Sequence, residues 1–142
     1  EEGRVRSLVA DLGLTGRTTF LGLVPREDLF EELASATASV VPSRAEGFGL
    51  VTIEAESVGT PVVASDIPPS RVTVADGESG LLVPLGDEDA LAEALTRVLT
   101  DGDLRARLSD GARRHFAEHF DLDRRLGSVA DRYEELARRR MR

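Results

Sequence analysis

The chain has 142 residues, of which 41% are hydrophobic, and a net charge of -8 at pH 7. This length suits one domain that buries roughly two-thirds of the surface of its unfolded chain. Cysteine and lysine are absent, which excludes thiol catalysis, disulfide bonds, cysteine-based zinc sites, Walker-type phosphate binding and Schiff-base chemistry. The acidic balance also disfavours a nucleic-acid partner, because binding a phosphate backbone requires a basic face.

The sequence carries no membrane-spanning or targeting signal. No apolar run approaches the roughly 18 residues of a membrane span, and the start, Glu1 to Arg4, lacks signal-peptide character. We therefore expect a soluble, cytoplasmic protein. The run from Arg138 to Arg140 allows peripheral contact with an anionic membrane, although basic residues at a helix end are also ordinary complements to the helix dipole.

Helical and strand patterns alternate from the start of the chain. Apolar spacing followed by Gly13 predicts a helix over residues 3–12, and residues 18–21 are predicted as a strand. Pro25 then opens a second helix. The apolar face of that helix contains Leu29, Phe30 and Leu33.

The alternation continues to residue 86. Strands are predicted at 38–41, 61–64 and 80–83, and a helix at 50–58 ends at Gly59. The segment 66–77 contains two prolines and is predicted as an ordered loop with room for one helical turn. Strands that alternate with helices indicate an α/β protein with a parallel, doubly wound sheet.

After residue 86 only helices are predicted. Asp87 is the expected N-cap of one helix, and Asp103 that of the next. A last amphipathic helix is expected over residues 122–136. The apolar faces of the first two helices are expected to contain Leu91, Leu95, Val98 and Leu99, and Leu104, Leu108, Ala112 and Phe116.

A glycine-rich turn lies where the strand at 38–41 passes to the helix at 50–58. In open α/β sheets this edge binds ligands, because the amides and positive dipole end of the helix point into the crevice. Gly47 and Gly49 allow positive φ and close backbone approach, so the amides from Phe48 to Val51, with Leu50 between them, could face a phosphate. Phe48 either walls the pocket or fills the core.

Two glutamates flank this turn, Glu46 and Glu54, with seven residues between them. The carboxylate of Glu54 can accept two hydrogen bonds at once, which suits the vicinal hydroxyls of a ribose. The alternatives are a solvated glutamate in the first helical turn and, for Glu46, an ordinary turn residue.

These residues and four other blocks resemble a known family. Residues 42–50 read P-S-R-A-E-G-F-G-L, and the two glutamates match an E-x7-E signature. The chain thus resembles the C-terminal, donor-binding half of retaining GT-B glycosyltransferases of family 4, also called glycosyl transferases group 1. The other matching blocks are T-F-L-G at 19–22, G-T-P-V-V-A-S-D at 59–66, G-L-L-V-P at 80–84 and A-L-A-E-A-L at 90–95.

The resemblance implies a Rossmann-like domain over residues 1–142, with an α/β core at 1–86 and C-terminal helices at 87–142. It also implies that the first strand–helix–strand unit of that domain is missing, which would uncover sheet edges for self-association. An N-terminal GT-B domain would be the expected partner, and this chain alone would be inactive.

The resemblance implies roles for particular residues. Glu46 would act at the reacting centre by contacting the donor sugar, Glu54 would bind the ribose, and residues 47–51 would face the diphosphate and sugar. Leu21, Gly22 and Leu23 would flank the base. The implied donor is a nucleoside-diphosphate sugar and the implied mechanism uses no metal or other cofactor; the base, the sugar and the acceptor stay open.

One segment departs from the family pattern, and one pair of histidines has the spacing of a metal site. Residues Pro68 to Val72 stand where the family commonly has a glycine pair, and Arg71 there is either a diphosphate contact or a solvated loop arginine. His115 and His119 have the spacing of a chelating pair on a helix, but no third ligand is evident. The rival functions are a non-catalytic nucleotide-sugar-binding or scaffold module and a sugar-nucleotide epimerase.

Overall fold

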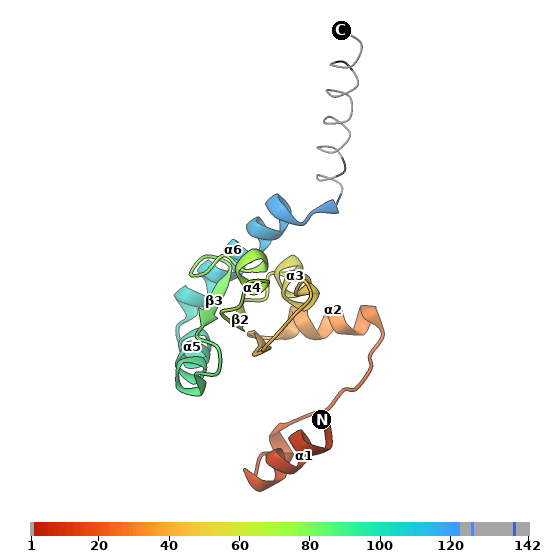
Figure 1. Ribbon diagram of the computed structural model, residues 1–142, viewed down its shortest axis with the longest axis vertical. Coiled ribbons are helices and arrows are strands. Elements are labelled where there is room, and N and C mark those ends of the chain that lie inside the picture. Colours follow the sequence, from red (N-terminus) through yellow and green to blue (C-terminus); the bar gives the residue numbers. More distant parts are fainter. Residues whose placement is uncertain (1, 123–125, 127–137, 139–142) are drawn as a thin grey trace.

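The computed structural model describes residues 2–122, 126 and 138, and most of the predicted helix at 122–136 lies outside this part of the chain. Figure 1 shows a central sheet wrapped by helices, with the first helix set apart from it. The elements in chain order are α1 (Glu2–Asp11), η1 (Thr15–Arg17), α2 (Arg26–Ser35), β1 (Ser39–Val41), α3 (Leu50–Val58), β2 (Val62–Ser65), α4 (Ser70–Thr73), β3 (Gly80–Val83), α5 (Glu88–Thr100) and α6 (Gly102–His119).

The sheet has three parallel strands in the order β1-β2-β3. Val63 of β2 aligns with Val40 on one side and Leu81 on the other. The helix α3 connects β1 to β2, and the single turn α4 lies between β2 and β3. The predicted α/β class, the parallel sheet and the three strands near 38–41, 61–64 and 80–83 are therefore confirmed.

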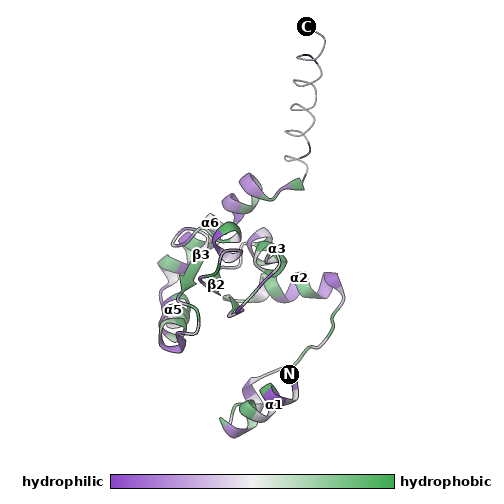
Figure 2. Ribbon diagram, viewed as in Figure 1, coloured by the Kyte–Doolittle hydropathy of each residue, from purple (hydrophilic) through white to green (hydrophobic). Residues whose placement is uncertain are grey.

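Helices cover both faces of the sheet, as the alternation of side chains along β2 requires. Val63 packs in a core with residues of α5 and α6, including Val98 and Leu108. Its neighbours Val62 and Ala64 pack on the opposite face with residues of α2 and α3. Figure 2 shows β3 in the green of apolar residues, whereas the helices around it mix green and purple. The domain is thus a doubly wound layer structure with two small cores.

The predicted strand at 18–21 is wrong. The described part of the chain pairs only β1, β2 and β3, and residues 18–21 form no strand. A strand needs a neighbour to receive its main-chain hydrogen bonds, and the described part of the chain has no strand paired with this segment. Instead, it runs between α1 and α2 (Figure 1), and Phe20 lies under the guanidinium of Arg6, 4.1 Å from the ring centre.

The helix ends are set by capping groups. The side chain of Asp87 accepts a hydrogen bond from the amide of Ala90 at 2.9 Å, so the predicted N-cap of α5 is confirmed. The predicted cap Asp103 is wrong: Asp101 caps α6 by accepting from the amide of Leu104 at 2.8 Å. The helix begins one residue after Asp101, so the side chain of Asp101 reaches the free amides at its start, and Asp103 lies inside the first turn.

The apolar faces of α5 and α6 agree with the sequence pattern except at one position. Leu104, Leu108 and Ala112 of α6 are buried, whereas Leu99 of α5 is exposed. Leu99 follows the fully buried Val98 by one residue, which turns it about 100° away from the core. Among the described residues, no helix combines the length and apolarity that a membrane span requires.

Candidate functional site

The turn before α3 depends on one glycine. Gly49 has φ +80° and caps the helix, and the amide of Thr52 donates to its carbonyl at 3.1 Å. The hydroxyl of Thr52 donates to the same carbonyl at 2.5 Å and lies 2.8 Å from the hydroxyl of Thr73, at the end of α4. The expectation of positive φ holds for Gly49 only, since Gly47 does not adopt it. The buried hydroxyl groups of Thr52 and Thr73 therefore connect the turn to α4, between β2 and β3.

Replacing Gly49 with alanine is expected to lower the free energy of unfolding by about 1–3 kcal/mol. The added Cβ would adopt a left-handed backbone conformation and would lie 3.1 Å from the hydroxyl of Thr52 and 3.2 Å from that of Thr73. Chemical denaturation measures the loss. Gly47→Ala is the matched control, because a Cβ there meets nothing within 4 Å. Equal losses in the two variants would contradict the role of Gly49.

The two glutamates occupy different surroundings. Glu46 is exposed in the turn, and Ser43 donates to its Oε1 at 2.5 Å. Glu54 is half-buried on the second turn of α3. The first amides of an α-helix have no partner within the helix, so Leu50 and Val51 present donors beside the turn. Their side chains and that of Phe48 are exposed, which settles that Phe48 does not plug the core.

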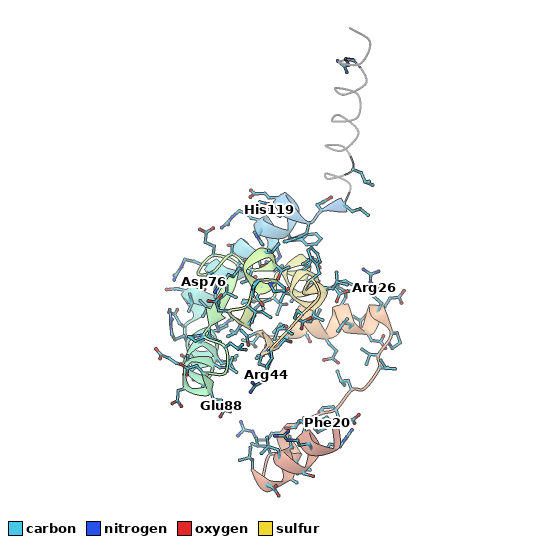
Figure 3. All side chains as sticks on the ribbon, viewed as in Figure 1. Phe20, Arg26, Arg44, Asp76, Glu88 and His119 are labelled. Atoms are coloured by element: carbon cyan, nitrogen blue, oxygen red, sulfur yellow. The ribbon has the colours of Figure 1, made fainter. Side chains whose placement is uncertain are left out.

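All three strands end at the same edge of the sheet, and a cavity of about 240 Å³ opens there. Arg44, Ser65 and Pro84 line it, one from beyond or at the end of each strand, together with Asp87 at the start of α5. Figure 3 shows the labelled Arg44 and Glu88 at this end of the molecule. A ligand site at this edge of the sheet was predicted from the sequence, but the contribution of residues at the start of α5 to its lining was not.

Arg71 is held by a carboxylate. Its Nε donates to Oδ1 of Asp66 at 2.6 Å and its Nη2 to Oδ2 at 3.0 Å, so the pair is bidentate. The hydrogen bond from Arg71 lowers the pKa of Asp66, and the same bond raises the pKa of Arg71. Both side chains are exposed, so Arg71 is a paired arginine of the single turn α4, and its remaining N–H groups stay available for an anion.

The structure does not bring the three residues predicted to flank a base to the turn. Leu21 and Leu23 are exposed, the latter at 105%, and their segment runs from α1 to α2 in Figure 1. The helix α1 itself buries no residue. The residues that the fold does bring together are those of the turn, α3 and the strand ends.

A buried charged cluster lies behind the turn, and sequence patterns did not predict it. Glu56 of α3 is 0% exposed; Ser79 donates to its Oε1, and Nδ1 of His115 lies 2.7 Å from its Oε2. Burial raises the pKa of Glu56, and the hydrogen bonds from Ser79 and His115 oppose this rise. The available signal was position alone: Glu56 shares a face of α3 with the buried Thr52 and follows the buried Ala55.

Comparisons with known proteins agree on one family. Residues 1–115 match the model of the family described as glycosyl transferases group 1. The D-inositol 3-phosphate glycosyltransferase of Acidothermus cellulolyticus is 42% identical over 141 residues, which cover 99% of this chain and 31% of that protein. That of Frankia alni is 46% identical over 105 residues, which cover 74% of this chain and 26% of that protein. The chain thus spans less than a third of these relatives.

The fold is similar to that of part of several solved structures. Sucrose-phosphate synthase from Thermosynechococcus elongatus has a TM-score of 0.85 and 38% identity, covering 94% of this chain and 33% of that one. Anabaena HepE, solved in complex with UDP-glucose, has a TM-score of 0.83 and 26% identity, covering 94% of this chain and 36% of that one.

Proposed function

Because the chain belongs to the glycosyl transferases group 1 family and has the fold of the C-terminal portion of GT-B glycosyltransferases, we propose that it binds a nucleoside-diphosphate sugar for retaining, family 4 glycosyl transfer. The observation that supports this proposal is the turn at Gly49, which begins α3 after β1, at the carboxyl edge of a parallel sheet, and is flanked in sequence by Glu46 and Glu54. The complex of Anabaena HepE with UDP-glucose supports the choice of ligand class.

Each residue has a proposed task. Glu54 accepts hydrogen bonds from the ribose hydroxyls, and residues 47–51 bind the diphosphate and sugar through main-chain amides. Glu46, oriented by Ser43, contacts the sugar hydroxyls near the reacting carbon. Arg71 contributes its remaining N–H groups to the diphosphate side. The bound donor is thereby oriented in a field of dipoles and charges, which is the chain's share of catalysis.

In our proposal, binding of the acceptor and completion of the transfer require a second domain. Residues 1–142 act as the donor-binding domain, and an N-terminal GT-B domain supplies the acceptor site. The transfer uses no metal and no further cofactor. In this proposal Leu21, Gly22 and Leu23 flank the base.

Replacing Glu54 with alanine is expected to weaken nucleotide binding by at least about tenfold, because two charge-assisted hydrogen bonds are lost. The chain is titrated with UDP, GDP and ADP, and binding is followed by ligand-observed NMR. We expect one nucleotide to bind saturably to the wild-type chain. Glu93→Ala is the matched control, since Glu93 is an exposed glutamate of α5.

Two results would contradict the proposal. Wild-type affinity in the Glu54→Ala variant would remove Glu54 from the site. No binding of any of the three nucleotides by a chain that unfolds cooperatively would show that these residues do not form a donor site by themselves.

A further inference from the structure

The carboxylate of Glu56 is fixed at both oxygens inside the protein. Ser79, from the loop before β3, donates to Oε1, and the imidazole of His115, from α6, pairs with Oε2 at 2.7 Å. The hydroxyl of Ser79 also accepts from the amide of Ala75 at 2.9 Å. A buried carboxylate is costly unless its hydrogen bonds are satisfied, so this geometry admits little freedom at Glu56. Three elements are thereby joined at one side chain.

The charged surroundings of Glu56 come from one helix. Among the described residues, the titratable side chains that act on Glu56 are His115 and His119, both on α6. Their rings lie 4.8 Å apart, and the side chain of His115 is only 15% exposed. The elements α2 and β1, which also pack on α3, contribute the apolar Leu33 and Val41 to the core there. The pair is thus a specific link between α3 and α6.

An aromatic chain leads from this pair to the glycine turn. The ring of His115 meets the ring of Phe120 edge to face at a centroid distance of 5.4 Å. Phe120 in turn meets Phe48 edge to face at 6.5 Å. Phe48 stands between the two glycines of the turn, so His115 contacts the turn through a single intervening side chain.

Glu54 and Glu56 lie on different sides of α3. Two residues along an α-helix correspond to about 200° around its axis, so the two glutamates project from nearly opposite sides of α3. Anchoring Glu56 on the buried side fixes the rotation of the helix about its own axis. The half-buried Glu54 is then directed away from α6.

We propose that Glu56 and His115 are positioning residues: their buried pair, continued through Phe120 to Phe48, sets the conformation of the turn at Gly47–Gly49 and the direction of Glu54. The link to nucleotide affinity rests on the proposed function, whereas the effect on the turn does not. The consequence is that a substitution behind α3, out of reach of any ligand, changes the donor site.

The test removes the pair without leaving a buried charge alone. The double variant Glu56→Met with His115→Phe retains size and the aromatic contact to Phe120, and deleting both charged partners together preserves folding better than deleting one. Hydrogen exchange of the Thr52 and Ile53 amides reports on the turn, because both donate to the carbonyl of Gly49. The amides of β2 report on global opening in the same sample.

We expect the Thr52 and Ile53 amides to exchange at least five times faster in the double variant, after correction for the β2 amides. Nucleotide affinity is expected to fall at least fivefold. The single variant Glu56→Gln, which keeps His115, should stay within about twofold of the wild type in both exchange rate and nucleotide affinity. Its side-chain amide can accept from Ser79 and donate to the imidazole nitrogen. Arg113→Ala is the control on the same pair of helices: Arg113 bonds the carbonyl of Val58 at the far end of α3 and should affect neither readout.

The outcomes separate the two hypotheses. Unchanged exchange at Thr52 and Ile53 in the folded double variant overturns the positioning role, whatever the nucleotide data show. Faster exchange in the double variant, together with near wild-type exchange in Glu56→Gln, supports the positioning role. A wild-type chain that binds no nucleotide would count against the proposed function alone.

Discussion

Replacing Gly111 with alanine is expected to lower the free energy of unfolding by about 3 kcal/mol, although alanine is the better helix former by about 1 kcal/mol. A Cβ on Gly111 would lie 1.8 Å from the carbonyl oxygen of Glu78 and 2.7 Å from its carbonyl carbon. These are main-chain atoms of the loop before β3, which cannot move aside as a flexible side chain does. The helix α6 must therefore shift away from this loop, and close-packed interiors resist such shifts.

Denaturant unfolding of the Gly111→Ala variant measures this effect. The matched control is Gly102→Ala on the same helix, where a Cβ would meet only the end of the Arg105 side chain at 3.8 Å. We expect Gly102→Ala to be neutral or slightly stabilising, by up to about 1 kcal/mol. Equal stability of the two variants would mean that α6 does not pack against the loop at Glu78.

The close approach at Gly111 also explains how the buried cluster forms. The amide nitrogen of Ser79 lies 3.4 Å from the position of the missing Cβ, so Ser79 is held directly against α6. Only then can its hydroxyl reach the carboxylate of Glu56 on α3. A glycine inside an 18-residue helix therefore serves packing here, at the cost of some helix propensity.

Local sequence signals were sufficient for the strands that pair in the described part of the chain. Apolar runs next to glycine or proline predicted β2 and β3, and Gly59 ended α3 as expected, with φ +81°. The same signals failed at 18–21, where the residues favour a strand but no described strand lies beside them. A segment with strand propensity becomes a strand only where a neighbouring strand pairs with it.

The site divides in the same way. The glycine turn and its flanking glutamates are contiguous in sequence, so their spacing carried the prediction of a ligand site. The pair of Glu56 and His115 joins residues 59 positions apart, and in sequence each has the pattern of a charged residue on an ordinary helix. Helical spacing alone could not show that both face the same buried space, because that depends on how α3 and α6 cross.

The last expected result concerns how the stability of the chain depends on pH. Burial raises the pKa of Glu56 above its ordinary value of 4.5 in the folded protein. Below that ordinary value the carboxyl group is protonated in both the folded and the unfolded chain, and folding carries no ionisation cost at Glu56. As the pH rises, the unfolded chain ionises first, so the folded state loses stability until the pH passes the raised pKa.

Comparing the wild-type chain with Glu56→Gln between pH 4 and pH 7 tests this effect, because the glutamine cannot ionise and the carboxylates that do not contact Glu56 contribute equally to both chains. The stability of Glu56→Gln relative to wild type is expected to rise with pH, by at most about 1.4 kcal/mol per pH unit, and then to level off. Asp66→Asn provides a slope of the opposite sign below about pH 4, since Arg71 lowers the pKa of Asp66 from its ordinary value of 3.8 and the stabilising contribution of Asp66 is lost as the pH falls below that value. A difference for Glu56→Gln that stays flat or falls with pH would show that the pKa of Glu56 is not raised, because the hydrogen bonds from Ser79 and His115 then offset the desolvation of its carboxylate.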